Sequence, residues 1–369
     1  MKYTLYVTIR SIEHCEVNII IVMISKIVCH DGSINNVIIV DQLPKQKNPS
    51  PHLISVGDDR NICINDAYLN ITFEDEPFYK IPCWNARPEH PGHRDKIYKV
   101  RTLERKNKLF IITASEDRKI KIFDYEDVKL LSVRTIDAHS DFIHCLEIIT
   151  KEVKIDGEDK LISTIISGSY DRTIKFWDFD SNNCLSTFIH DKNLFCLTIN
   201  GDDMAVGCGT HIIIWDVIQR TEKGRIRKHK RPVIAIKYAI SAEPDVYDTK
   251  LISTSDDKTL CIWDPNTLEL IHMMETKTPI YAFEVWNNDP LPALITGAWG
   301  SFKDKDHPIH IYDLNTLELI ETFNGHRGKI MNITAWHTEK QILITSASKD
   351  ESIRTFDLMP TFRVHLAKP

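Results

Sequence analysis

The chain has 369 residues, of which 42% are hydrophobic and 27% are charged, the composition of an ordinary globular protein. Its 46 basic and 52 acidic residues give a formal net charge of -6, so any attraction to nucleic acid or to a membrane must come from a local patch. The length allows two or three average domains or one large all-β domain.

The nine cysteines are scattered through apolar stretches and form no Cys-x-x-Cys pair. An odd, unpatterned count is typical of reduced, buried thiols. It predicts a protein of the cytoplasm or the nucleus. Neither a disulfide framework nor a zinc site is expected.

Two apolar segments precede the first repeat. The second, VNIIIVMISKIV at residues 17–28, is too short to span a bilayer and is interrupted by Lys26. The stretch before it carries Arg10, Glu13 and Glu16 where a signal peptide would need an unbroken apolar core. The sequence therefore predicts neither a targeting segment nor a transmembrane segment.

Further along the chain, short runs of alternating apolar residues repeatedly end in an aromatic–aspartate pair, as in KIKIFD, TIKFWD and TLCIWD. Counting a degenerate first copy, NICIND, there are seven copies, spaced 38 to 58 residues apart. This spacing fits one four-stranded unit per copy with loops of variable length. The closing aspartates are Asp66, Asp124, Asp178, Asp216, Asp264, Asp313 and Asp357.

Polar residues recur at fixed offsets in these copies. An aspartate stands six residues before the aromatic position in six copies, and a serine or threonine stands ten residues before it in five. A histidine precedes six of the copies, and the fourth copy has Gly209 in place of the aspartate. The complete sets are His139, Ser167, Asp171 and Trp177 in the third copy, and His229, Ser253, Asp257 and Trp263 in the fifth. Because catalysis needs one constellation at one place, a repeated set predicts a structural role.

With these residues in phase, the sequence resembles the WD-repeat family of β-propellers over roughly residues 17–358. The resemblance implies an all-β, seven-bladed propeller of four-stranded antiparallel blades around a central channel. It also implies that the recurring His, Ser/Thr, Asp and Trp form hydrogen-bonded structural tetrads. We expect residues 1–28 to be a leader and ring-closing strand, and residues 29–369 to form the propeller.

Propellers of this family usually complete the last blade with a strand from the opposite terminus. We predict that residues 19–28 close the seventh blade as its outer strand. Residues 361–367, TFRVHLA, compete for the same edge from within their own blade. Residues 4–11 are then surplus, and they are either an added edge strand or a disordered leader.

Three features are candidates for partner binding. Arg60, Arg118 and Arg172 each follow the aspartate of their copy, a position that suits acidic or phosphorylated peptides but is also a common turn pairing. The run KGRIRKHKR is either a phosphate-docking patch or a solvated charged loop. Trp84, in the proline-rich connection 73–93, is either an interface anchor or part of a cluster that folds back on the first blade. The residues of the basic run singled out here are Lys228, Lys230 and Arg231.

The predicted function is that of a non-catalytic scaffold for protein–protein interactions, with no cofactor, no metal and no enzymatic activity. One alternative is substrate recognition for a ubiquitin ligase, because the third copy and the short fourth copy resemble F-box propellers. Against it, the WDxR signature is missing and no F-box-like segment precedes the first copy. The other alternative is a phosphate-binding propeller for RNA or phosphoinositide, which lacks the FRRG motif and depends on the basic run alone.

Overall fold

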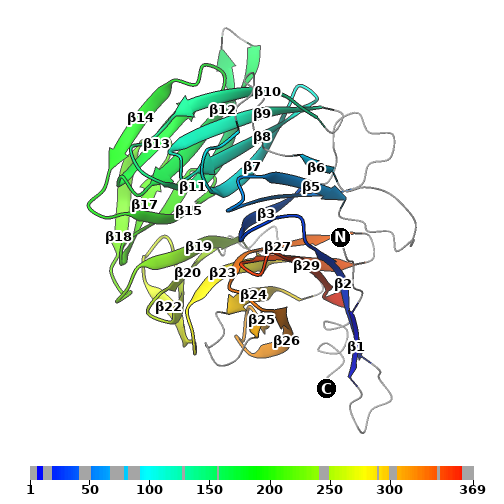
Figure 1. Ribbon diagram of the computed structural model, residues 1–369. Helices are drawn as coiled ribbons and strands as arrows, with labels where there is room; N and C mark the ends of the chain where they lie inside the picture. Colours follow the sequence, from blue (N-terminus) through cyan, green and yellow to red (C-terminus); the bar gives the residue numbers. More distant parts are fainter. Residues whose placement is uncertain are drawn as a thin grey trace.

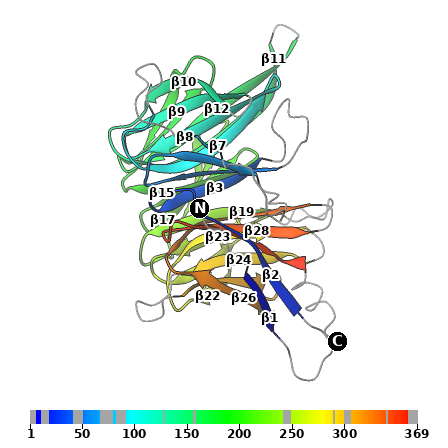
Figure 2. The same cartoon turned by 45° about the vertical axis from the view of Figure 1, so that its right-hand side comes forward.

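The computed structural model describes residues 6–10, 19–40, 51–66, 79–81, 92–126, 129–155, 158–240, 249–288, 291–298, 306–338 and 341–359. Every secondary-structure element assigned within these ranges is a β-strand, and the strands form seven antiparallel sheets. The sheets lie around a ring, seen from two directions in Figures 1 and 2. The predicted seven-bladed, all-β propeller is confirmed.

Each blade is numbered here in chain order, with its strands listed from the innermost to the outermost. Blade one contains β3 (Ile34–Val40), β4 (His52–Gly57), β5 (Ile62–Asp66) and β6 (Tyr79–Ile81). Blade two contains β7 (Ile97–Arg105), β8 (Lys108–Ser115), β9 (Lys119–Glu126) and β10 (Lys129–Asp137). Blade three contains β11 (Ile143–Ile155), β12 (Glu158–Ser169), β13 (Thr173–Asp178) and β14 (Cys184–Ile189).

Blade four contains β15 (Leu194–Asn200), β16 (Asp203–Cys208), β17 (His211–Asp216) and β18 (Thr221–Ile226). Blade five contains β19 (Val233–Ile240), β20 (Thr249–Ser255), β21 (Thr259–Trp263) and β22 (Leu270–Glu275). Blade six contains β23 (Ile280–Trp286), β24 (Ala293–Ala298), β25 (His307–Asp313) and β26 (Leu319–His326). Blade seven contains β27 (Ile330–His337), β28 (Ile342–Ser348) and β29 (Ile353–Asp357), joined by β2 (Ile19–Ile27) and β1 (Tyr6–Arg10).

The core lies between the blades. The inner strand of each blade contacts the inner strand of the next, and β27 contacts β3, which completes the circle. Seven separate apolar clusters fill the seven spaces between neighbouring blades. The alternating sequence pattern explains this arrangement, because successive residues of a strand point to opposite faces and each face packs on a different neighbour.

The ring is closed by the N-terminal strand, as predicted. Strand β2 pairs antiparallel with β29 from Met23 opposite Phe356 to Ile27 opposite Ile353. Strand β1 pairs with β2 and extends the sheet to five strands, so the surplus segment is an added edge strand. In Figure 1, β2 lies next to β29 and β1 lies beyond β2. The competing residues 361–367 lie outside the described residues.

All seven inner strands share an irregularity near their first residue. The pairing of the inner strand with its neighbour shifts register there, which is the mark of a β-bulge. The skipped residues are Asn35, Tyr98, His144, Phe195, Ile234, Tyr281 and Met331. Because a bulge redirects one side chain, these seven residues occupy equivalent positions around the ring.

Candidate functional site

Blade three brings its four predicted tetrad residues within hydrogen-bonding distance of one another. His139 precedes β11, and its Nδ1 lies 2.9 Å from Oδ2 of Asp171 in the turn between β12 and β13. Its Nε2 lies 2.7 Å from Oγ of Ser167 on β12. The indole N–H of Trp177 on β13 donates to the same oxygen at 2.9 Å.

Blade five repeats this geometry. Nδ1 of His229 lies 3.1 Å from Oδ2 of Asp257, and Nε2 lies 2.9 Å from Oγ of Ser253. The indole N–H of Trp263 donates to Oγ of Ser253 at 2.8 Å. The two complete sets therefore link one inter-blade connection, one turn and two strands in the same way.

Three further blades contain the set without a tryptophan. In each, the histidine Nδ1 lies 2.7 to 2.9 Å from the aspartate, and Nε2 lies 2.8 to 2.9 Å from the hydroxyl oxygen. These sets are His30, Ser55 and Asp59 in blade one, His93, Thr113 and Asp117 in blade two, and His326, Ser346 and Asp350 in blade seven.

Blade four departs from the pattern because its turn is one residue shorter. Trp215 pairs with Met204, eleven positions earlier, whereas Trp177 pairs with Ile165, twelve positions earlier. The place of the tetrad hydroxyl is thereby taken by Val206, and the turn has no aspartate. Within the described part of the chain, Nε2 of His190 and Nε1 of Trp215 are buried without a hydrogen-bond partner.

Burial and hydrogen bonding set the charges of the tetrads. Burial is the largest cause that lowers the pKa of His139. Burial also opposes ionisation of Asp171, but hydrogen bonds from His139 and Thr173 outweigh it and hold the pKa of Asp171 below its usual value. A neutral imidazole beside a carboxylate is therefore favoured, and the same directions hold in blades two, five and seven.

Two histidines show how strongly the neighbours matter. Burial lowers the pKa of His190 to about 4, because no carboxylate accepts a hydrogen bond from it. Burial also works against protonation of His30, but its interactions with Asp59 and Cys29 outweigh burial and raise its pKa to about 9.

The tetrad residues do not line the pocket between the inner strands of blades one, two and seven. This pocket of about 380 Å³ has Ile38, Arg101 and Trp336 among its lining residues. Each complete tetrad already uses its hydroxyl, imidazole and carboxylate internally. Chemically, the arrangement holds the inter-blade connection to the turn of its own blade.

Comparison with known families assigns the repeat. Four segments match the repeat described as "WD domain, G-beta repeat", at residues 86–124, 131–178, 221–264 and 317–357. Their last residues are the closing aspartates of blades two, three, five and seven, each of which holds the bonded histidine–aspartate pair. The chain is a WD-repeat β-propeller.

Curated proteins similar to this propeller include "WD repeat-containing protein 89 homolog" of Dictyostelium discoideum, 26% identical over 42% of the chain and 38% of the relative. "Pre-mRNA-processing factor 17" of Mus musculus is 27% identical over 47% of the chain and 28% of the relative. "tRNA (guanine-N(7)-)-methyltransferase non-catalytic subunit wuho" of Anopheles gambiae is 25% identical over 54% of the chain and 45% of the relative. The matches thus cover less than half of each of these relatives.

The three turn arginines occupy equivalent positions on blades one, two and three of the propeller. Arg60, Arg118 and Arg172 are exposed and have φ angles of 66°, 69° and 67°. The acidic residues beside them bond elsewhere: Oδ1 of Asp58 accepts from Asn35, and Oε2 of Glu116 accepts from Tyr98. Among the described residues, no ion pair involves any of the three guanidinium groups.

The basic run spans β18 and the connection to β19. Three of its six basic residues pair with acidic side chains: Lys223 with Asp203, Arg225 with Glu222, and Arg231 with Asp256. Lys228 and Lys230 are exposed, and across the described ranges neither forms an ion pair. The backbone N–H of Lys230 donates to Asp257 at 2.8 Å, which places these residues beside the turn that carries Lys258. Trp84 lies outside the described residues.

A row of stacked rings extends over the bulges of blades two to four. The His144 ring lies between those of Tyr98 and Tyr170, with centroids 4.3 and 4.4 Å away, and Tyr170 meets Phe195 edge-on at 5.3 Å. All four side chains are half-buried. The sequence analysis did not predict this row, although Tyr98, His144 and Phe195 each stand one place after the first apolar residue of their inner strand, which was a usable signal.

Proposed function

We propose that this propeller is a non-catalytic scaffold that binds partner proteins on the face carrying the tetrad turns. The turns between the second and third strands and the connections between blades reach this face together, because His139 bonds to Asp171 and Lys230 bonds to Asp257. A closed ring presents such loops preorganised, which limits the entropy lost on binding.

The observation that carries the proposal is the conformation of the turn arginines. A left-handed φ costs a non-glycine residue roughly 1–2 kcal/mol, and glycine or asparagine avoids most of that cost. Three successive blades nevertheless have an exposed arginine there. A guanidinium group at Arg60, Arg118 and Arg172 suits bidentate contact with carboxylates or phosphates.

We therefore infer an acidic or phosphorylated segment of a protein as the partner. The free ammonium groups of Lys228 and Lys230 extend the same charge to blade five. The half-buried rings of Tyr98, His144 and Tyr170 offer apolar contact on blades two and three, which also carry Arg118 and Arg172. Among relatives, one is named a non-catalytic subunit, which is consistent with a role in assembly.

We also propose a cytoplasmic or nuclear location and a single propeller domain that includes the closing strand. The seven described cysteines form no disulfide with one another, and five of them are buried, as is usual in a reducing compartment. No helix in the described ranges has the length and apolar character needed to cross a membrane.

The test compares two triple variants of equal charge change. Arg60→Glu/Arg118→Glu/Arg172→Glu reverses the turn arginines. Its control, Lys106→Glu/Lys108→Glu/Lys160→Glu, reverses exposed lysines near the turns between the first and second strands, at the opposite end of the blades. Partners of each protein are identified by affinity purification and quantitative mass spectrometry, and folding is checked by circular dichroism.

We expect a specific partner to be lost with the arginine variant and retained with the lysine variant. Its retention on the native chain should fall as salt increases, since exposed charges are screened within about 10 Å at 0.1 M salt. Equal retention of every partner by both folded variants would contradict the proposed face.

A further inference from the structure

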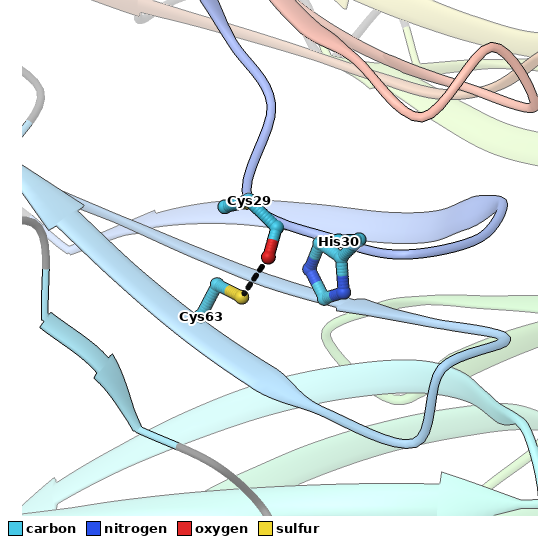
Figure 3. Close-up of side chains that lie close together, drawn as sticks. All are labelled: Cys29, His30 and Cys63. Atoms are coloured by element: carbon cyan, nitrogen blue, oxygen red, sulfur yellow. Dashed lines mark hydrogen bonds between the residues drawn. The ribbon is translucent and has the colours of Figure 1, made fainter. Parts of the chain in front are cut away.

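Three soft donor groups meet where the last blade joins the first. Cys29 and His30 follow the closing strand β2, and Cys63 lies on β5 of blade one. Their side chains are 0 to 3% exposed, and one ligand atom of each lies within 4.8 Å of the others. Figure 3 shows Cys63 reaching toward the backbone of Cys29, whose oxygen is 3.3 Å from the Cys63 sulfur, with His30 beside them.

A buried polar group without a partner lies on the same face of the sheet. Asn65 occupies the position that Trp177 and Trp263 hold in blades three and five. It is two residues after Cys63, so both side chains point to the same side of β5. Asn65 is 2% exposed, and neither its amide oxygen nor its amide nitrogen has a hydrogen-bond partner among the described residues. Such an orphaned amide is costly unless something else occupies the space.

The surroundings of His30 are those of a metal-binding imidazole. Its Nδ1 lies 2.7 Å from the carboxylate of Asp59, which orients the ring and leaves Nε2 as the nitrogen available for a metal. Oγ of Ser55 lies 2.9 Å from Nε2 and 3.6 Å from the Cys29 sulfur. Two sulfurs, one nitrogen and a neighbouring oxygen are a donor set suited to a tetrahedral ion.

We propose that Cys29, His30 and Cys63 bind one Zn²⁺ ion at the junction of blades one and seven. Zinc displaces the protons of the two thiols and binds the lone pair of Nε2 in place of its hydrogen bond with Ser55, while the N–H of Nδ1 keeps its hydrogen bond to Asp59. Two thiolates balance the charge of Zn²⁺, so the buried site gains no net charge; a monovalent ion would leave one negative charge unbalanced.

Blade five supplies an internal comparison. Cys261 occupies the place of Cys63, two residues before the tetrad aromatic position, and lies in the same blade as His229. There, however, Lys228 stands in the place of Cys29, and the indole of Trp263 bonds to the serine hydroxyl. One sulfur without the second cannot form the site, which makes Cys261→Ser the matched control for Cys63→Ser.

The experiment uses the full chain, purified without chelator, offered Zn²⁺ and then dialysed against metal-free buffer. Zinc is measured by inductively coupled plasma mass spectrometry. We expect about one zinc ion per native chain and per Cys261→Ser chain, and near none for Cys29→Ser or Cys63→Ser, as for other sites that need both thiolates. Substitution by Co²⁺ should give the native chain a thiolate-to-cobalt charge-transfer band.

A second measurement needs no variant. Zinc should raise the thermal unfolding midpoint of the metal-free native chain by a few degrees, because it binds the folded state. Chelator should reverse the rise. Absence of zinc from a folded native chain, or the same zinc content in Cys63→Ser as in Cys261→Ser, would overturn the proposal.

Discussion

The tetrads differ between blades in which of the hydrogen-bonding side chains are present. Phe123 and Phe356 occupy the tryptophan position in blades two and seven and have no N–H to donate. Blade four keeps His190 and Trp215 but lacks a hydroxyl to receive them, because Val206 fills that place. Each tetrad is therefore a set of separable hydrogen bonds whose contributions can be measured one at a time.

Exchanging threonine and valine between two blades tests this directly. Thr113→Val removes the hydroxyl that bonds to Nε2 of His93 at 2.8 Å, and it should destabilise the chain by about 1–3 kcal/mol, since a buried imidazole loses its partner. Val206→Thr should be neutral or stabilising, because it offers a hydroxyl to the orphaned His190 and Trp215. Both are measured by urea unfolding. Similar losses in the two variants would show that a hydroxyl at position 206 does not bond to His190 or Trp215.

The lowered pKa of His190 predicts a dependence of stability on pH. The unfolded chain protonates this histidine below its ordinary pKa of about 6.5, whereas the folded chain does so only near pH 4. Between these values the unfolded state binds more protons, so the free energy of unfolding falls as the solution is acidified.

Replacing the group isolates its share of this effect. In His190→Asn, the free energy of unfolding should fall less steeply between pH 6.5 and 5. The slope should decrease by at most roughly 1.4 kcal/mol per pH unit, which corresponds to a difference of one bound proton. The comparison is made by urea unfolding of native and variant chains at several pH values. An unchanged slope would mean that His190 titrates normally in the folded chain.

Residue patterns predicted the tetrads of blades three and five because their turns have equal length. Fixed offsets from the aromatic residue could not show that the turn of blade four is one residue shorter. That difference becomes visible only in the pairing of Trp215 with Met204. The cluster at Cys29, His30 and Cys63 was also missed. Its two cysteines are far apart in the sequence and meet because the connection that carries Cys29 and His30 is bonded to blade one.

At the scale of elements, the added strand β1 and the closing strand β2 have different roles. Strand β2 pairs on one side with β29, and Ile27 belongs to the apolar cluster between blades seven and one. Among the described strands, β1 pairs with β2 alone, at the end of the five-stranded sheet. The sequence left the role of residues 4–11 open, because a short alternating segment fits a strand or a leader equally well.

Two truncations separate these roles. Removing residues 1–28 should abolish soluble expression, because it opens blade seven and exposes the β29 edge and the cluster around Ile27. Removing residues 1–16 deletes β1 alone and should leave a folded, soluble propeller. Expression and circular dichroism are compared for the two chains. A normal melting curve for the larger truncation would refute ring closure by β2.

For the whole molecule, the apolar clusters between all neighbouring blades predict cooperative unfolding. Each blade needs both neighbours to bury its two faces, so opening one junction exposes surface on two blades. The seven-bladed ring was predictable from the sequence for the same reason: the repeat spacing and the alternation in every copy describe one unit seven times. The orientation of loops on the proposed binding face could not be predicted in the same way, since it depends on bulges and turn angles.

Buried thiols in different blades can report on this cooperativity. Cys145, Cys208 and Cys261 are buried in blades three, four and five, whereas Cys184 is exposed. A thiol reagent should label Cys184 at once and the three buried thiols later, at one common rate set by global opening. Peptide-resolved mass spectrometry measures each rate. Clearly different rates for the three would indicate blade-by-blade opening.

The pairing of β2 with β29 also has a consequence for biosynthesis. Ile27 leaves the ribosome long before its partner Ile353 is translated. At 5–20 residues per second, the apolar strand waits roughly 16–65 s for its partner. During that interval the unpaired apolar strand is prone to aggregation. A chaperone that binds it during translation should therefore raise the yield of native protein more than one acting after release.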